Sequence, residues 1–262
     1  MKKKKVTAEE LNKLMLNRLK NIKVDYVQKY DNALSKDLCE YFIKKHKEID
    51  KKGLLVKGRF DSSGEGVKSI DKSFKDSREV YLVTNEVLEN YKKHGTRNKK
   101  MKKSDLFNVS EDEEFLEKYN QVREIVNKHV YLYLMHVGYF GNYYMGITKQ
   151  NMKIYIKEDS DYPEPNIDVG FGSFCLRRYN KLEGGYHSPH FDNKVRFNRI
   201  LAIIIYLNDV EFGGETSFPI TKDKIEPKQG RIGIFPSNFT HLHYGKRASS
   251  EKYLLVTHAS RY

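Results

Sequence analysis

The sequence predicts an α+β fold, in which a helical first half packs against an antiparallel β second half. In the first half, apolar residues recur at spacings of three and four, the period of a helix with one buried face. From about residue 150, short β-branched and aromatic runs are separated by Gly, Pro, Asn and Asp. No internal repeat and no Pro- or Ser-rich linker divides the chain. We therefore expect one domain at 24–262, preceded by a basic appendage at 1–23.

Three stretches of the first half have the pattern of amphipathic helices. Thr7 and Glu10 form a capping-box pattern for the first, and Ser35 is placed to open the second. The third and longest is predicted to begin at Ser110, three residues before Glu113. The residues expected on the buried faces of the second and third helices are Leu38, Phe42, Ile49, Phe115, Tyr119, Val122, Val126, Val130 and Tyr133.

Five runs of the second half are predicted to be strands, because they are short, rich in β-branched and aromatic residues, and bounded by turn-forming residues. Between the third and fourth runs, Gly213 and Gly214 predict a tight turn, since glycine adopts positive φ without strain. The five runs are MKIYIKE (152–158), GSFCLRRY (172–179), RILAIIIYLN (199–208), GRIGIFP (230–236) and KYLLVTH (252–258).

The composition is typical of a soluble globular protein, with 39% hydrophobic and 32% charged residues. Cys39 and Cys175 lie far apart and have no zinc-finger spacing, which favours reduced thiols in a cytosol-like compartment. The basic start is not followed by the apolar segment of a secretory signal, and no run approaches the roughly 18 apolar residues of a membrane span. We expect a cytoplasmic protein that is not attached to a membrane.

The formal net charge of +13 raises the question of nucleic acid, because clustered lysines release counterions from phosphates. Much of this charge lies in two short runs, at 2–5 and 97–103, which have the character of a tail and a loop. Such runs are usually solvated surface, so nucleic acid is a partner that we do not favour.

A candidate metal site begins at His190 and Asp192. In an extended strand, residues at i and i+2 point to the same face, so both side chains are placed to bind one ion. A third ligand from 241–243 would complete a set of two histidines and one carboxylate around iron, which leaves positions open for a bidentate acid and dioxygen. Lys252 follows as a cation that is placed to hold the far carboxylate of that acid.

With these motifs in order, the chain resembles the iron(II)- and 2-oxoglutarate-dependent dioxygenases, most closely the prolyl 4-hydroxylase-like group. The segment at 30–48 is similar to the helix that opens the family's domain, and Lys252-Tyr253 matches its "KY". The family's "Y…GGY…H-x-D" falls on Tyr179, Gly184, Gly185, Tyr186, His190 and Asp192. Its "YLN…GGET.FP" falls on Tyr206, Leu207, Asn208, Gly213, Gly214, Glu215, Thr216, Phe218 and Pro219.

The resemblance implies a double-stranded β-helix, or jelly roll, with helices packed on the larger sheet. It implies Fe(II) as cofactor, 2-oxoglutarate as cosubstrate and ascorbate as reductant. The implied activity resembles that of procollagen-proline 4-dioxygenase: hydroxylation of a prolyl residue in a peptide or protein, with succinate and CO2 as products. Tyr179 and Tyr206 match positions that line the 2-oxoglutarate pocket, and Lys252 matches the anchor of the acid.

The family pattern favours His243 over His241 as the third ligand. Both are expected at the start of a strand on one face, but they lie roughly 6.6 Å apart along it, so only one can be in register with His190 and Asp192. The family ligand tends to lie six residues after the position of Ser237, which selects His243. One departure is His258, which stands where the family often has Trp.

Alternatives to prolyl hydroxylation stay open. The same chemistry serves nucleic-acid demethylases and free amino-acid hydroxylases, and a jelly roll without catalysis would be a binding module. The presence of His190, Asp192 and Lys252 argues against the last of these. The Gly- and Ser-rich segment at 57–76 is expected to close over the substrate as a lid. The pattern does not predict an oligomeric state.

Overall fold

The computed structural model describes residues 25–58, 60–61, 68–70, 72, 75–94, 105–137, 169–182, 184–193 and 199–261. Several expectations concern segments outside this set. They are the basic appendage, the capping-box helix at Thr7, the strand at 152–158, the basic run at 97–103 and much of the segment at 57–76.

The two longest described helices, α2 and α4, form from the predicted amphipathic patterns, whereas α3 was not predicted. Ser35 caps α2, its hydroxyl accepting a hydrogen bond from the backbone N–H of Leu38. The predicted start of the longest helix is two residues early, because Ser110 lies in a 3₁₀ turn and the carboxylate of Asp112 accepts from the N–H of Phe115. The helical segments are α2 (Lys36–Lys51), α3 (Asn85–His94), α4 (Glu113–His136), η2 (Val109–Glu111) and η4 (Phe239–His241).

The described strands form two main sheets and one small hairpin. The larger sheet runs in the order β1 (Gln28–Tyr30), β14 (Ile232–Pro236), β11 (Arg199–Tyr206), β16 (Lys252–Arg261), β9 (Phe174–Tyr179), β6 (Arg78–Val83) and β2 (Val56–Lys57), with β7 (Leu106–Asn108) on β6 and β8 (Val169–Phe171) on β16. The smaller sheet runs in the order β13 (Lys224–Ile225), β12 (Thr216–Ser217), β15 (His243–Gly245), β10 (Gly185–His190) and β5 (Lys75–Asp76). The hairpin pairs β3 (Phe60–Asp61) with β4 (Lys68–Ser69).

Strand β11 shows why the central run of the sequence is continuously apolar. Ile203 and Ile205 pack into the cluster that contains the buried stripes of α2 and α4, whereas Ile204 and Tyr206 pack into a second cluster on the opposite face. The second cluster also contains Phe218 of the segment after β12. Because both faces of β11 are covered, its side chains do not alternate between apolar and polar.

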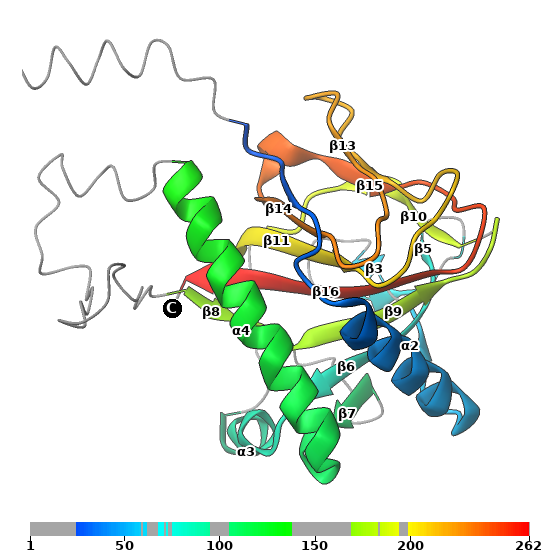
Figure 1. Ribbon diagram of the computed structural model, residues 1–262, viewed down its shortest axis with the longest axis vertical. Coiled ribbons are helices and arrows are strands. Elements are labelled where there is room, and N and C mark those ends of the chain that lie inside the picture. Colours follow the sequence, from blue (N-terminus) through cyan, green and yellow to red (C-terminus); the bar gives the residue numbers. More distant parts are fainter. Residues whose placement is uncertain are drawn as a thin grey trace, which may run out of the picture.

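The two sheets and their helices form a jelly roll with α2 and α4 packed on the larger sheet, as predicted. Figure 1 shows α4 crossing the strands of the larger sheet diagonally and α2 beside β9, with the labelled strands of the smaller sheet gathered away from α4. The predicted strands that are described appear as β9, β11, β14 and β16. All nine residues that were expected on the buried helix faces are buried.

Candidate functional site

Two histidines meet across a pair of antiparallel strands in the smaller sheet. His190 ends β10, His243 begins β15, and their Cα atoms are direct partners in the register. Side chains of directly opposed residues share a face of the sheet, and the centroids of the two imidazole rings lie 4.4 Å apart. The register therefore brings together two residues that are far apart in the sequence.

Asp192 joins the histidines by a route that differs from the predicted one. Strand β10 ends at His190, so Asp192 lies beyond the strand, where its backbone N–H donates to the carbonyl of Ser237 at 3.0 Å. Asp192 Oδ1 lies 4.0 Å from Nε2 of His190, and Oδ2 lies 3.5 Å from Nε2 of His243. One potential ligand atom from each residue falls within 4.8 Å of the others, a spacing that a single ion can span.

Hydrogen bonds orient both imidazole rings for metal binding. Nδ1 of His190 lies 2.8 Å from the carbonyl oxygen of Ser188, and Nδ1 of His243 lies 3.0 Å from that of His241. Because a carbonyl only accepts, each Nδ1 carries the hydrogen, and a neutral ring then keeps its lone pair on Nε2. Metal-bound histidines in proteins are held in this way. The donor set therefore fits a divalent transition metal.

The electrostatics of the cluster keep its ligand atoms available. Burial, with His243 close by, lowers the pKa of His190 to about 3, so its ring is neutral near pH 7. Burial acts to raise the pKa of Asp192, but the surrounding histidines outweigh it and hold that pKa well below its ordinary value. An ionised carboxylate and neutral imidazoles are the forms that bind a metal ion.

His241 is separated from this cluster. It ends the 3₁₀ turn η4 rather than beginning a strand, which corrects the expectation that it shares a strand face with His243. Its Nδ1 lies 2.8 Å from the hydroxyl oxygen of Thr240, and its ring lies edge-on to Tyr26 and Phe218. The side chain of His241 is buried rather than exposed, and its ring nitrogens are not among the grouped ligand atoms.

Lys252 lies inside the jelly roll at the start of β16. Its side chain is 2% exposed, its Nζ donates to the carbonyl of Gly214 at 2.7 Å, and the ammonium lies 4.9 Å from the ring centroid of Tyr179. Burial lowers the pKa of Lys252 to about 7, although Glu215 acts in the opposite direction. Among the described residues, no carboxylate lies within salt-bridge distance of Lys252, and such a buried cation is suited to receive an anion.

The turn that contacts Lys252 requires glycine. Gly213 and Gly214 have φ values of +72° and +75°, as the sequence predicted, and a Cβ on Gly213 would lie 2.1 Å from the carbonyl oxygen of Arg247. Without this close approach, the carbonyl of Gly214 would not be held against the ammonium of Lys252.

The two predicted pocket tyrosines differ in their surroundings. The hydroxyl of Tyr179 accepts a hydrogen bond from Arg177 at 3.3 Å, and its ring lies beneath Lys252. The hydroxyl of Tyr206 lies 2.8 Å from that of Thr216 and donates to the carbonyl of Ile225 at 3.1 Å. Tyr206 therefore ties β11 to the smaller sheet, and its role toward a cosubstrate stays a prediction.

The sequence analysis did not single out a buried charged group near the site, the trio of Lys75, Glu79 and Arg177. Glu79 Oε2 lies 2.9 Å from Nζ of Lys75 and 2.6 Å from Nε of Arg177. Glu79 and Arg177 belong to the larger sheet and Lys75 to the smaller one, so the trio links the two sheets. Arg177 shares a strand face with Tyr179 in β9, which was the available signal. The sequence around Lys75 has no comparable pattern that would have predicted its place in the trio.

A second feature that the sequence analysis missed is the stacking of Tyr186 on His190. Their ring centroids lie 3.7 Å apart with an interplanar angle of 18°, and Nζ of Lys75 lies 5.5 Å from the ring centroid of Tyr186. The ring of Tyr186 covers one face of the His190 imidazole. Its contact with Lys75 brings the charged trio beside the three candidate metal ligands.

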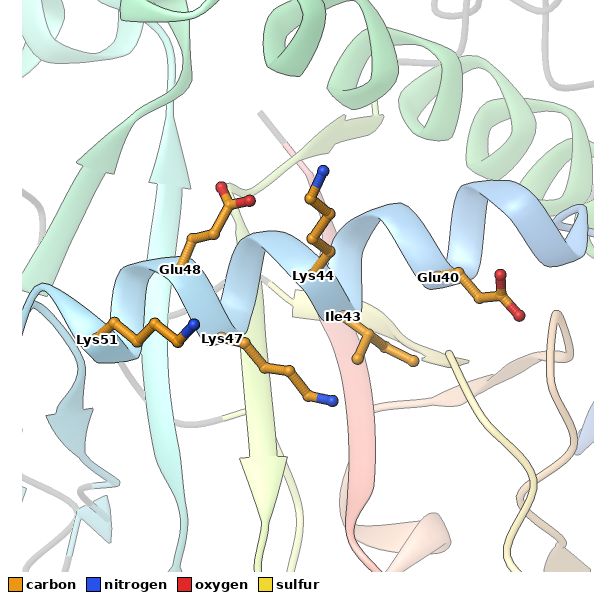
Figure 2. A pocket seen from close by; sticks show the side chains of 6 residues that line it. All are labelled: Glu40, Ile43, Lys44, Lys47, Glu48 and Lys51. Carbon is orange, nitrogen blue, oxygen red and sulfur yellow. The ribbon is translucent and has the colours of Figure 1, made fainter.

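A surface hollow of about 390 Å³ lies along one side of α2, away from this site. Figure 2 shows the side chains that line it, all projecting from the one helix. They are Glu40, Ile43, Lys44, Lys47, Glu48 and Lys51. Since α2 packs on the outer face of the larger sheet, this hollow does not communicate with the jelly-roll interior.

No helix among the described residues is both long enough and apolar enough to cross a membrane. The two cysteines, Cys39 and Cys175, are free and buried.

Comparison with known proteins places this geometry in context. Residues 174–259 match the sequence pattern of the 2OG-Fe(II) oxygenase superfamily, where 2OG denotes 2-oxoglutarate. A search of curated proteins found no significant match.

Two solved structures share the fold. A prolyl hydroxylase from Trichoplax adhaerens, in complex with a peptide fragment of the oxygen degradation domain of hypoxia inducible factor, is 14% identical, with a TM-score of 0.57 over 97% of this chain and 94% of that one. A prolyl-4-hydroxylase from Pseudomonas putida is 13% identical, with a TM-score of 0.51 over 95% of this chain and 100% of that one. Residues 174–259 are therefore similar in sequence to 2OG-Fe(II) oxygenases, and the chain shares the fold of these two prolyl hydroxylases.

Proposed function

We propose that the protein is an Fe(II)- and 2-oxoglutarate-dependent dioxygenase that hydroxylates a prolyl residue in a peptide or protein, with ascorbate as reductant. The observation that carries the proposal is the cluster of His190, Asp192 and His243, in which Nε2 of both imidazoles lies within 4.0 Å of one carboxylate. Bound iron would couple the decarboxylation of 2-oxoglutarate, to succinate and CO2, to oxidation of the substrate.

The protein's own residues have separable tasks in this proposal. His190, Asp192 and His243 hold the metal, and Lys252 holds the far carboxylate of 2-oxoglutarate beside the ring of Tyr179. The apolar cluster between the sheets excludes water from the reacting atoms. The prolyl substrate is supported by the fold shared with two prolyl hydroxylases, one of which is described in complex with a peptide.

Substrate-coupled succinate formation tests the proposal. The full chain is loaded anaerobically with Fe(II), and succinate is measured after oxygen is admitted with proline-rich peptides, methylated oligonucleotides or free amino acids offered separately. We expect peptide-dependent succinate together with hydroxyproline. Because the net charge is +13, the oligonucleotide is the serious alternative, and succinate coupled to its demethylation would reject the prolyl assignment.

Replacing Lys252 with methionine is expected to weaken 2-oxoglutarate binding tenfold to a hundredfold and to leave metal affinity unchanged. A hydrogen bond to a charged group contributes about 1.5–3 kcal/mol, which corresponds to that range. The measurement is calorimetric titration of the Mn(II)-loaded protein with 2-oxoglutarate. Lys246→Met is the control, since Lys246 is exposed and pairs with Glu215. Equal affinity for 2-oxoglutarate in Lys252→Met and wild type would show that another cation, such as Arg261, anchors the acid.

The same titration has an expected pH dependence. Burial places the pKa of Lys252 at about 7 in the free protein, and only the ammonium form attracts a carboxylate. Affinity for 2-oxoglutarate should therefore be constant below pH 7 and fall as the pH rises above it, because binding must then take up a proton. Titrations in buffers of different ionisation enthalpy measure this uptake. The number of protons taken up per 2-oxoglutarate bound should approach one above pH 7 in wild type and should be zero in Lys252→Met.

A further inference from the structure

A fourth histidine lies beside the metal cluster without belonging to it. His258 is on β16, where it is the cross-strand partner of Ala202, on the face of the larger sheet that lines the jelly-roll interior. Its Nε2 lies 3.3 Å from Oδ2 of Asp192. Within the described part of the chain, this nitrogen is buried and makes no hydrogen bond of acceptable geometry. The carboxylate of Asp192 is therefore the acceptor available to Nε2 of His258.

The positions of the atoms separate His258 from the three candidate ligands. The ligand atoms that lie within 4.8 Å of one another come from His190, Asp192 and His243, and the set does not include His258. Oδ1 of Asp192 lies 4.0 Å from Nε2 of His190, whereas Oδ2 lies 3.5 Å from Nε2 of His243 and 3.3 Å from Nε2 of His258. His258 would therefore contact a ligand rather than a bound ion.

A carboxylate that binds a metal through one oxygen leaves its second oxygen with unused acceptor capacity. In a buried site, that oxygen needs a donor, and such outer partners set the orientation of metal-binding carboxylates. Among the described residues near Asp192, the side chain of His258 supplies a ring nitrogen at hydrogen-bonding distance from Oδ2. The backbone N–H groups of Asp192 and Asn193 do not serve this oxygen, because both donate to the carbonyl of Ser237.

We propose that His258 is a positioning residue that donates its Nε2–H to the free oxygen of Asp192 and thereby holds this carboxylate as a one-oxygen ligand of the metal. This inference rests on the proposed metal site. It assigns a task to the histidine that stands where tryptophan is frequent in proteins that this sequence resembles.

Metal affinity, measured on full-length protein, tests the proposal without turnover. His258→Leu removes the donor at similar volume, and His258→Gln keeps an N–H at the end of a side chain of similar length. Loss of an outer-shell partner typically costs 10–100-fold in metal affinity, so we expect that weakening for leucine in Co(II) titrations and recovery of most of it for glutamine. The visible Co(II) spectrum should change in the leucine variant and return toward wild type in the glutamine variant.

Controls separate a positioning role from a structural one. His241→Leu removes another buried histidine of the same region that has no contact with Asp192, and it should leave Co(II) affinity unchanged. In Zn(II)-loaded wild type, the Nε2–H proton of His258 should be observed by NMR and should exchange slowly with solvent, which does not depend on any variant folding.

The outcomes distinguish this proposal from the proposed function. Wild-type protein that binds neither Fe(II) nor Co(II) would reject the metal site and, with it, the role of His258. Wild-type metal binding together with unchanged affinity in His258→Leu would overturn the positioning role alone. Equal weakening by leucine and glutamine would also overturn it, because the donor would then be irrelevant.

Discussion

Replacing His243 with alanine is expected to lower the affinity for Fe(II) by more than about a hundredfold and to abolish turnover. Loss of a partner outside the metal's own ligands already costs 10–100-fold, and removal of one of three protein ligands should exceed that. His243 is the cross-strand partner of His190, and its Nε2 lies 3.5 Å from Asp192. Iron retained after anaerobic loading and desalting, together with succinate formation, measures the effect.

His241→Ala is the matched control for this experiment. Both histidines are buried and lie two positions apart, but His241 packs against Tyr26 and Phe218 rather than facing Asp192. We expect His241→Ala to retain iron and activity. An iron-free His241→Ala with an active His243→Ala would show that the register of β10 and β15 does not define the site.

Replacing Glu79 with glutamine is expected to reduce the free energy of unfolding by about 3–5 kcal/mol, the usual result of breaking a buried ion pair from one side. The change leaves Lys75 and Arg177 buried without their shared anion, and both cations contact Glu79 within 3 Å. Urea unfolding of the apo-protein measures the loss. Lys246→Gln is the control, because its pair with Glu215 is partly exposed and should contribute at most about 1 kcal/mol.

The contribution of Glu79 should also depend on pH. Burial alone would raise the pKa of Glu79, but Arg177 and Lys75 outweigh it and lower the pKa from 4.5 to about 2. Because the folded-state pKa lies below the unfolded one, this stabilisation is complete above about pH 4.5 and is lost as the pH falls toward 2. Wild type and Glu79→Gln should therefore converge in stability as the solution is acidified. A constant difference between them down to pH 2 would contradict this account.

Local patterns were sufficient for α2, α4, β9, β11, β14 and β16. The expectation of a helical first half was wrong in part, because it missed α3 and the strands β1 to β7, most of which are short and several of which pair with distant segments. The stripe from Phe115 to Tyr133 identifies α4, since the period of three and four needs no knowledge of partners. Its start was predicted two residues early, because Ser110 is a good capping residue but lies in the 3₁₀ turn η2, and Asp112 caps the helix instead.

The candidate site shows a different limit of prediction. His190, Asp192 and His243 were selected from spacing and family resemblance, and the structure brings them together. Asp192 nevertheless does not lie in the predicted strand, because the carbonyl of Ser237, 45 positions later, holds it beyond the end of β10. Long-range contacts of this kind leave no periodic trace in the sequence. The same holds for Lys75, whose buried charge is compensated by Glu79.

Strand β1 has a consequence for how the chain reaches this fold. It pairs with β14 through Gln28 and Ile234, and Asp31 binds Arg231 across a sequence separation of 200 residues. Pairings between such distant segments form late, and proteins that depend on them commonly fold in milliseconds to seconds. Until β1 arrives, the apolar strand IGIFP presents unpaired backbone N–H and C=O groups at the edge of the larger sheet. In the folded protein, the segment QKY covers this edge, so the backbone groups of β14 that pair with β1 are not available to another copy of the chain.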